Sequence, residues 1–293
     1  MGAEDFQSRS KTWLSQYKRE VLDVEEDGKW LRNNRAYSHI LPIAQQRLNI
    51  LPACRNDFWG WFPGKEIRLH KDFHHLNSSQ ALCFNLFFPL LMSRGPGLSG
   101  LLRVLDLTGS PVEGSTFEFE PDRTEGTNFD FTIPLDTGGR VYFELKYTEK
   151  GFGTAKEDDR HLRKFESVYR SRVESRFRPP YCTASGFLKN YQILRNVWHL
   201  NLASGDTAVF LFPRATGCFA NAENIIRSCL LEPLRPHVII MHIEDLIDEL
   251  DVAATHRGEP ESNSLSEFRL KYFPSAQNQG FSSEGFQETS AAR

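Results

Sequence analysis

The sequence predicts an α/β protein in which helices flank a mixed central sheet. Three short segments alternate between apolar and polar residues, as strands with one buried face do: Thr116–Glu120, Asn128–Ile133 and Val141–Tyr147. Two later segments, Thr207–Phe212 and His237–His242, are almost continuously apolar, which is typical of central strands. Helical segments precede, separate and follow these strands. That order predicts an α/β sandwich around one sheet.

The three alternating strands are expected to sort their side chains onto two faces. One face collects apolar side chains: Phe117, Phe119, Phe129, Phe131, Ile133, Val141, Phe143 and Leu145. The other face collects polar side chains: Glu118, Glu120, Asp130, Thr132, Glu144 and Lys146. Residues 134–139 join the second and third strands, and their glycines suit a hairpin loop because glycine tolerates positive φ.

One helix stands out because it is apolar nearly all round and must therefore be buried. It is expected over Gln80–Met92, after the N-cap sequence Asn77–Ser79. The other helices are expected over residues 6–24, 29–50 with an interruption at Pro42, 158–177, 186–200, 220–231 and 243–250. Residues 56–71 are expected to be irregular and aromatic, and residues 101–106 to form a strand or the end of a helix.

The chain is expected to have three parts. A helical extension covers residues 1–66, the main α/β domain covers residues 67–274, and a tail rich in Ser, Gln, Gly and Glu covers residues 275–293. The composition of the tail predicts disorder, because it offers too little apolar surface to bury.

Composition restricts the compartment and the partners. The formal net charge is -3, so binding to nucleic acid would need local positive regions. The five cysteines are scattered and lack C-x-x-C spacing, which indicates reduced thiols. No apolar run reaches the length of a signal peptide core near the start, or of a membrane span elsewhere. We therefore expect a cytoplasmic protein without a membrane partner.

The polar face of the predicted hairpin favours a metal site. Carboxylates held close together resist ionising together, and a divalent cation removes that conflict. Mg²⁺ prefers oxygen ligands and is typically held by one or two carboxylates with water and substrate phosphate. Lys146 follows Glu144 by two residues and projects to the same side. It could orient an attacking water or stabilise charge on a phosphate.

An Asp on one strand followed by Glu-x-Lys on the next resembles the PD-(D/E)XK nuclease superfamily, the restriction-endonuclease-like fold. Asp130 matches its acidic residue, and Glu144 and Lys146 match its E-x-K. Segments 77–82 and 37–42 are similar to bacterial putative restriction endonucleases of that superfamily. The resemblance implies an α-β-β-β-α-β core and a Mg²⁺-dependent DNA endonuclease, with Mn²⁺ able to substitute, acting in restriction or phage defence. Cutting both strands would suit a homodimer.

The resemblance also implies roles for individual residues. Asp130 and Glu144 would hold the metal, the backbone carbonyl of Leu145 would complete the ligand set, and Lys146 would act on the water or the phosphate. The buried helix of this superfamily often carries a Glu toward the site, but this chain has Gln80 there. Gln80 could orient a water or a metal ligand, or be a buried amide satisfied by backbone. Glu118 or Glu120 could compensate for the missing carboxylate.

Basic residues after the third strand are candidates for DNA contact. Lys150 and Lys156 lie in a glycine-containing loop, and Arg160, Arg163, Lys164 and Arg170 lie on the predicted helix that follows. Acidic residues on the same helix favour the alternative of a salt-bridged surface helix.

Two other functions remain open at the level of sequence. The first is an inactive restriction-like module that binds DNA. The second is a protein unrelated to nucleic acid whose sheet face is merely charged, with Glu144 and Lys146 paired across strands. The sequence contains no phosphate-binding P-loop, no G-x-S-x-G motif and no H-E-x-x-H motif, which argues against those enzyme classes.

Overall fold

The computed structural model describes residues 3–93, 97–216, 218–256 and 263–273. The tail predicted over residues 275–293 lies outside these ranges. A five-stranded sheet in the order β3-β4-β5-β6-β7 forms the centre. Its strands are β3 Thr116–Phe119, β4 Phe129–Pro134, β5 Arg140–Leu145, β6 Thr207–Phe212 and β7 Val238–His242. β3, β4 and β5 pair antiparallel, whereas β5, β6 and β7 pair parallel. The predicted mixed sheet is confirmed.

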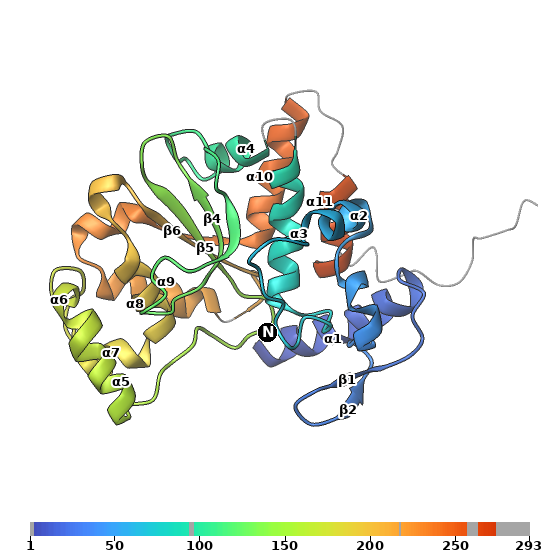
Figure 1. Ribbon diagram of the computed structural model, residues 1–293, viewed down its shortest axis with the longest axis horizontal. Coiled ribbons are helices and arrows are strands. Elements are labelled where there is room, and N and C mark those ends of the chain that lie inside the picture. Colours follow the sequence, from blue (N-terminus) through green and yellow to red (C-terminus); the bar gives the residue numbers. More distant parts are fainter. Residues whose placement is uncertain (1–2, 94–96, 217, 257–262, 274–293) are drawn as a thin grey trace, which may run out of the picture.

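Helices cover both faces of this sheet (Figure 1). One face carries α3 Ser79–Met92, α4 Gly97–Val104 and α10 Ile243–His256, and against them lie α1 Ala3–Glu20, α2 Pro52–Trp61 and α11 Asn263–Tyr272. The other face carries α5 Asp159–Lys164, the π-helical η2 Phe165–Tyr169, α6 Arg170–Val173, α7 Ala184–Lys189, α8 Tyr191–His199 and α9 Cys218–Cys229. Short 3₁₀ helices are η1 Ile43–Asn49, η3 Leu202–Ser204 and η4 Glu232–His237. Within the described ranges, no helix is both long and apolar enough to span a bilayer.

Two hydrophobic cores lie on opposite faces of the sheet. In the first, Phe87 of α3 stacks on Phe131 of β4, with ring centroids 4.6 Å apart. In the second, Phe129 of β4 lies 4.5 Å from the ring of Tyr142 of β5. The N-terminal segment contributes to the first core, which includes Trp13. The sequence boundary at residue 66 therefore does not coincide with a break in packing.

The expected single apolar face of the hairpin was wrong for Phe119 and Phe129. Both rings pack with the second core, whereas Phe117 and Phe131 pack in the first. Glu118 between the two β3 residues has a left-handed backbone, with φ of 53°. This conformation breaks the period-two alternation of a strand. The pairing of Phe119 with Phe129 carries the change of face into β4.

The predicted helix over residues 29–50 was also wrong. The chain forms a hairpin there, from β1 Gly28–Trp30 and β2 Arg35–Tyr37, followed by η1. Asn34 adopts a φ of 55°, which Asn tolerates better than most residues, and the side-chain oxygen of Asn33 accepts a hydrogen bond from the backbone nitrogen of Arg35. Local turn chemistry thus outweighs the helical spacing of apolar residues.

Other differences are smaller. Residues 56–71 include the end of α2, which has Pro52 in its first turn, and residues 101–106 include the end of α4. The helix expected over residues 158–177 contains the π-helical segment η2, and the helix expected over residues 186–200 is divided at Asn190 into α7 and α8. The helix α11 was not predicted from the sequence.

Candidate active site

Asp130, Glu144 and Lys146 come together where β4 and β5 part. The Oδ2 atom of Asp130 accepts a hydrogen bond of 2.7 Å from the backbone nitrogen of Leu145. Lys146 Nζ donates to Glu144 Oε1 at 2.7 Å, since both side chains project to the same side of β5. Glu144 and Lys146 are buried, whereas Asp130 keeps part of its surface open to solvent. The arrangement is therefore a closed ion pair beside a more accessible carboxylate.

Two amides from α8 hold the Glu144 carboxylate from the other side. Gln192 Nε2 donates to Glu144 Oε1 at 2.5 Å, and Asn196 Nδ2 donates to Glu144 Oε2 at 2.9 Å. The two amides are four residues apart and so lie on one face of the helix. Asn196 belongs to the site but was not predicted from the sequence. The available signal was a pair of amides at helical spacing among apolar residues.

The charges in this site determine its protonation. Burial of its carboxyl group raises the pKa of Asp130 well above the usual range, and the nearby charges of Glu144 and Glu118 raise it further. Burial alone would lower the pKa of Lys146, but the carboxylates of Glu144 and Asp130 outweigh that effect and raise it. Lys146 is consequently an ammonium at neutral pH.

Gln80 is buried at the start of α3 and holds Glu118. Its Nε2 atom donates to Glu118 Oε1 at 2.8 Å and to the carbonyl of Arg68 at 2.9 Å. Its Oε1 atom accepts from the backbone nitrogen of His70 at 2.8 Å. The amide is thus satisfied by two backbone groups and one carboxylate, and its oxygen already has a partner. Gln80 positions Glu118 at the edge of the site.

Glu118 has further partners on the side away from Gln80. Its Oε2 atom accepts a short hydrogen bond from Asn128 Nδ2 and lies 3.5 Å from His70 Nε2. The hydrogen bond to Glu118 raises the pKa of His70 above its ordinary value. Glu118 therefore contributes negative charge to the site through a carboxylate that is already bonded to neighbouring side chains.

The donors around Asp130 suit a hard cation. Across the described part of the chain, no group of three or more His, Cys, Asp and Glu side chains is arranged to hold a metal ion. The Asp130 and Glu144 carboxylates, with the carbonyl of Leu145, offer only oxygen, and Mg²⁺ is commonly held by one or two carboxylates with water and phosphate oxygens. The mutual repulsion that raises the pKa of Asp130 is what a bound cation would relieve.

The basic residues predicted to contact DNA differ in their surroundings. Lys150, Lys156, Arg160 and Arg163 have exposed side chains. Arg170 is exposed and paired with Glu166 on the same helical segment. Lys164 instead turns inward, where its Nζ atom donates to Glu125 Oε1 at 3.0 Å and to the hydroxyl of Tyr191 at 3.2 Å.

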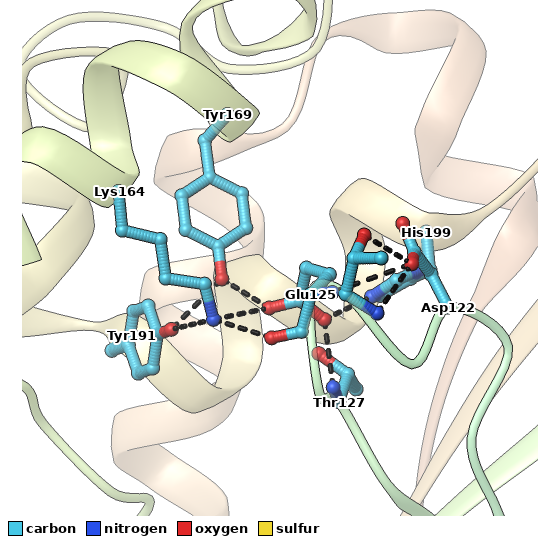
Figure 2. Close-up of polar contacts among 8 residues, drawn as sticks. Asp122, Glu125, Thr127, Lys164, Tyr169, Tyr191 and His199 are labelled. Atoms are coloured by element: carbon cyan, nitrogen blue, oxygen red, sulfur yellow. Dashed lines mark hydrogen bonds and ion pairs between the residues drawn. The ribbon is translucent and has the colours of Figure 1, made fainter.

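Lys164 belongs to a second polar cluster, which was not predicted from the sequence (Figure 2). The Glu125 carboxylate is fully buried and lies among donors from Lys164, Tyr169, His199 and the backbone of Thr127. Burial would raise the pKa of Glu125, but the hydrogen bonds from His199, Thr127, Tyr169 and Lys164 lower it well below the usual range. The cluster ties the loop between β3 and β4 to η2 and α8.

The fold and the arrangement at the end of β5 define a restriction-endonuclease-like protein. The chain belongs to the family described as REase-ARP, Restriction Endonuclease associating with ARP, which matches residues 10–273. Comparison with curated proteins and with solved structures gave no match.

Proposed function

We propose that this protein is a Mg²⁺-dependent nuclease that hydrolyses phosphodiester bonds of DNA. The observation that carries the proposal is the meeting of Asp130 with the Glu144–Lys146 ion pair at the ends of adjacent strands. Membership of a restriction endonuclease family supports the same chemistry. A role in restriction or phage defence would follow from that family.

In the proposed mechanism, Asp130 and Glu144 hold Mg²⁺ together with the carbonyl of Leu145. The ion supplies a Lewis acid that polarises the phosphate and lowers the pKa of the attacking water. Gln192 and Asn196 fix the orientation of the Glu144 carboxylate. Such support matters because small displacements of a reacting group are costly in rate.

Lys146 acts in this mechanism as a cation. Its pKa is raised, so an ammonium that already carries its proton cannot accept another from water. It can donate hydrogen bonds to the attacking water or to the phosphate oxygens as negative charge develops on them. Lys146 therefore orients the nucleophile or stabilises the transition state.

Plasmid cleavage tests the proposal directly. The native protein is incubated with supercoiled DNA in Mg²⁺, in Mn²⁺ and in chelator, and is compared with Asp130→Asn and Lys146→Met. Asp248→Asn and Lys65→Met serve as matched controls, because both residues are exposed and lie outside the candidate active site. We expect metal-dependent nicking that both site variants lose and both controls keep.

The negative outcomes differ in meaning. Absence of cleavage with salt-sensitive DNA binding would reject the nuclease and leave a DNA-binding module. Absence of both cleavage and binding would reject a nucleic-acid function. Cleavage that survives in Asp130→Asn and Lys146→Met would show that another site acts.

A further inference from the structure

A cavity of about 440 Å³ separates the N-terminal segment from the end of β5. Its walls come from α1, the β1–β2 hairpin, the segment before α3, and Thr148 and Glu149 just after β5. This volume lies within the range of small-molecule sites, roughly 300 to 1,000 Å³. We call it the Trp30 pocket, after the residue at its hairpin wall.

One wall of the Trp30 pocket consists of contacting rings. Trp30 lies 6.1 Å from Tyr37 and 6.1 Å from His75, and His39 lies 5.9 Å from Tyr37 and 6.5 Å from His75. Burial lowers the pKa of both His39 and His75 to about 4, so the two imidazoles are neutral at pH 7. A wall of neutral rings favours a flat aromatic ligand over a phosphate group.

Two residues of the same pocket carry buried polar atoms without a hydrogen-bond partner. These atoms are the indole Nε1 of Trp30, a donor, and the amide Oδ1 of Asn77, an acceptor. The other amide atom of Asn77 is occupied, since Nδ2 donates to Thr148 Oγ1 at 2.9 Å. Buried polar atoms in folded proteins almost always have partners. A donor and an acceptor left open on one pocket indicate a ligand that offers both.

The Trp30 pocket adjoins the candidate active site. Thr148 and Glu149 follow Lys146 by two and three residues along the chain. His70 lines the pocket and lies 3.5 Å from Glu118 of the candidate site. Lys11 and Lys71, which also line the pocket, supply positive charge for a phosphate backbone.

We propose that the Trp30 pocket binds one nucleobase, taken out of the stack of the DNA strand that enters the candidate active site. The base would stack against the ring wall and exchange hydrogen bonds with Trp30 and Asn77. Holding this base would fix which phosphate lies beside Asp130. This inference rests on the proposed function for the source of the base, but the pocket chemistry can be tested without cleavage.

The test measures binding with the full-length Asp130→Asn protein, so that cleavage plays no part. The probes are single-stranded 12-nucleotide DNAs of equal charge, one intact and the others carrying one abasic site at successive positions. Base stacking on aromatic side chains predicts that one abasic position weakens binding about tenfold. Trp30→Phe keeps an aromatic ring and removes the open N–H. It should weaken binding of intact DNA severalfold while leaving that abasic probe unaffected.

Controls separate this pocket from general effects. Trp61→Phe makes the same chemical change outside the pocket, next to Phe88 and Phe117, and should leave DNA binding unchanged. Unchanged thermal unfolding of Trp30→Phe would exclude loss of the hairpin. Deoxynucleoside monophosphates that compete as well as DNA would identify a free nucleotide as the source of the base, and the nucleobase assignment would stand.

Equal binding of every abasic probe, with no binding of mononucleotides, would overturn the proposal and leave a water-filled cavity. That result is distinguishable from failure of the proposed function. The latter appears as absence of cleavage by the native protein, whereas the former concerns binding by a variant that does not need to cleave.

Discussion

Lys146 is the residue whose charge state is best determined by its surroundings. It is buried against Glu144 at 2.7 Å, and the two site carboxylates keep it protonated. Replacing it with Met removes the cation but keeps a side chain of similar length. We expect the single-turnover cleavage rate of Lys146→Met to fall about 100-fold to 1,000-fold, the usual effect of removing one preorganised donor.

Lys146→Arg provides a sharper comparison at the same position. Arginine keeps the charge, but its planar fork does not fit a buried site shaped for one Nζ atom. We therefore expect only partial recovery of the rate, measured from pH 6 to 9. Full recovery in Lys146→Arg would mean that charge alone matters. A rate in the native protein that falls as a lysine of lowered pKa deprotonates would contradict the ammonium assignment.

Asp130 is held in the opposite balance, because its negative charge is unfavourable without a cation. Burial and the charges of Glu144 and Glu118 disfavour its ionised form. Asp130→Asn removes that charge, and the amide oxygen can still accept from the Leu145 backbone nitrogen. We expect the variant to melt about 2 to 4 °C higher than the native protein in chelator, a shift that corresponds to about 1 kcal/mol in a large domain.

Added Mg²⁺ provides the complementary measurement for Asp130. A cation that binds only the folded native protein raises its melting temperature, so the native protein should gain stability with Mg²⁺ and Asp130→Asn should not. Thermal unfolding monitored by circular dichroism measures both effects. A variant that melts lower than the native protein in chelator would contradict the repulsion argument, and an equal response to Mg²⁺ would contradict the ligand assignment.

At the scale of elements, the sequence predicted what depends on local periodicity. Strand alternation places Glu144 and Lys146 on one side of β5, and their contact follows from that alone. Gln192 and Asn196 reach Glu144 only because α8 docks on that face of the sheet, and no local pattern contains the docking. The left-handed Glu118 was equally hidden, because a non-glycine residue with positive φ leaves no sequence signal.

The Glu125 cluster joins elements that are distant in sequence, and its removal should therefore destabilise the fold. Glu125→Gln leaves Lys164 and His199 without their carboxylate. Breaking a buried ion pair by removing one partner typically costs about 3 to 5 kcal/mol. We expect a decrease in the free energy of unfolding of that order at pH 7, measured by urea denaturation. Asp122→Asn is the control in the same loop, because that carboxylate is exposed.

The pH dependence of the same cluster has a definite sign. The pKa of Glu125 is lower in the folded protein than in the unfolded chain. Its contribution to stability is therefore fully present above the unfolded pKa of about 4.3 and is lost as the pH falls through the folded value. The stability difference between native protein and Glu125→Gln should be largest near pH 7 and shrink below about pH 4. A difference that grows with acid would contradict this assignment.

At the scale of the whole molecule, the net charge of -3 requires that attraction to DNA be local. Arg160 and Arg163 are exposed on α5, on the same side of the sheet as α8, which contacts Glu144. Lys164 is left out of this proposed DNA-binding surface because it is bonded to Glu125. The basic segment predicted from the sequence thus divides into exposed residues and one inward-facing residue, a division that charge patterning alone does not reveal.

The double change Arg160→Gln with Arg163→Gln tests this surface. Removing one arginine that neutralises a phosphate should lower the slope of log K against log salt by about one, so the double change should lower it by about two. Binding is measured in the Asp130→Asn background from 50 to 200 mM salt, and cleavage at saturating DNA in the native background. We expect weaker binding with an unchanged maximal rate, because neither residue is placed at the reacting phosphate. Arg227→Gln, an exposed arginine paired with Glu223 on α9, is the control. An unchanged salt slope in the double variant, with a slope lowered by Arg227→Gln, would move the DNA-binding surface from α5 to α9.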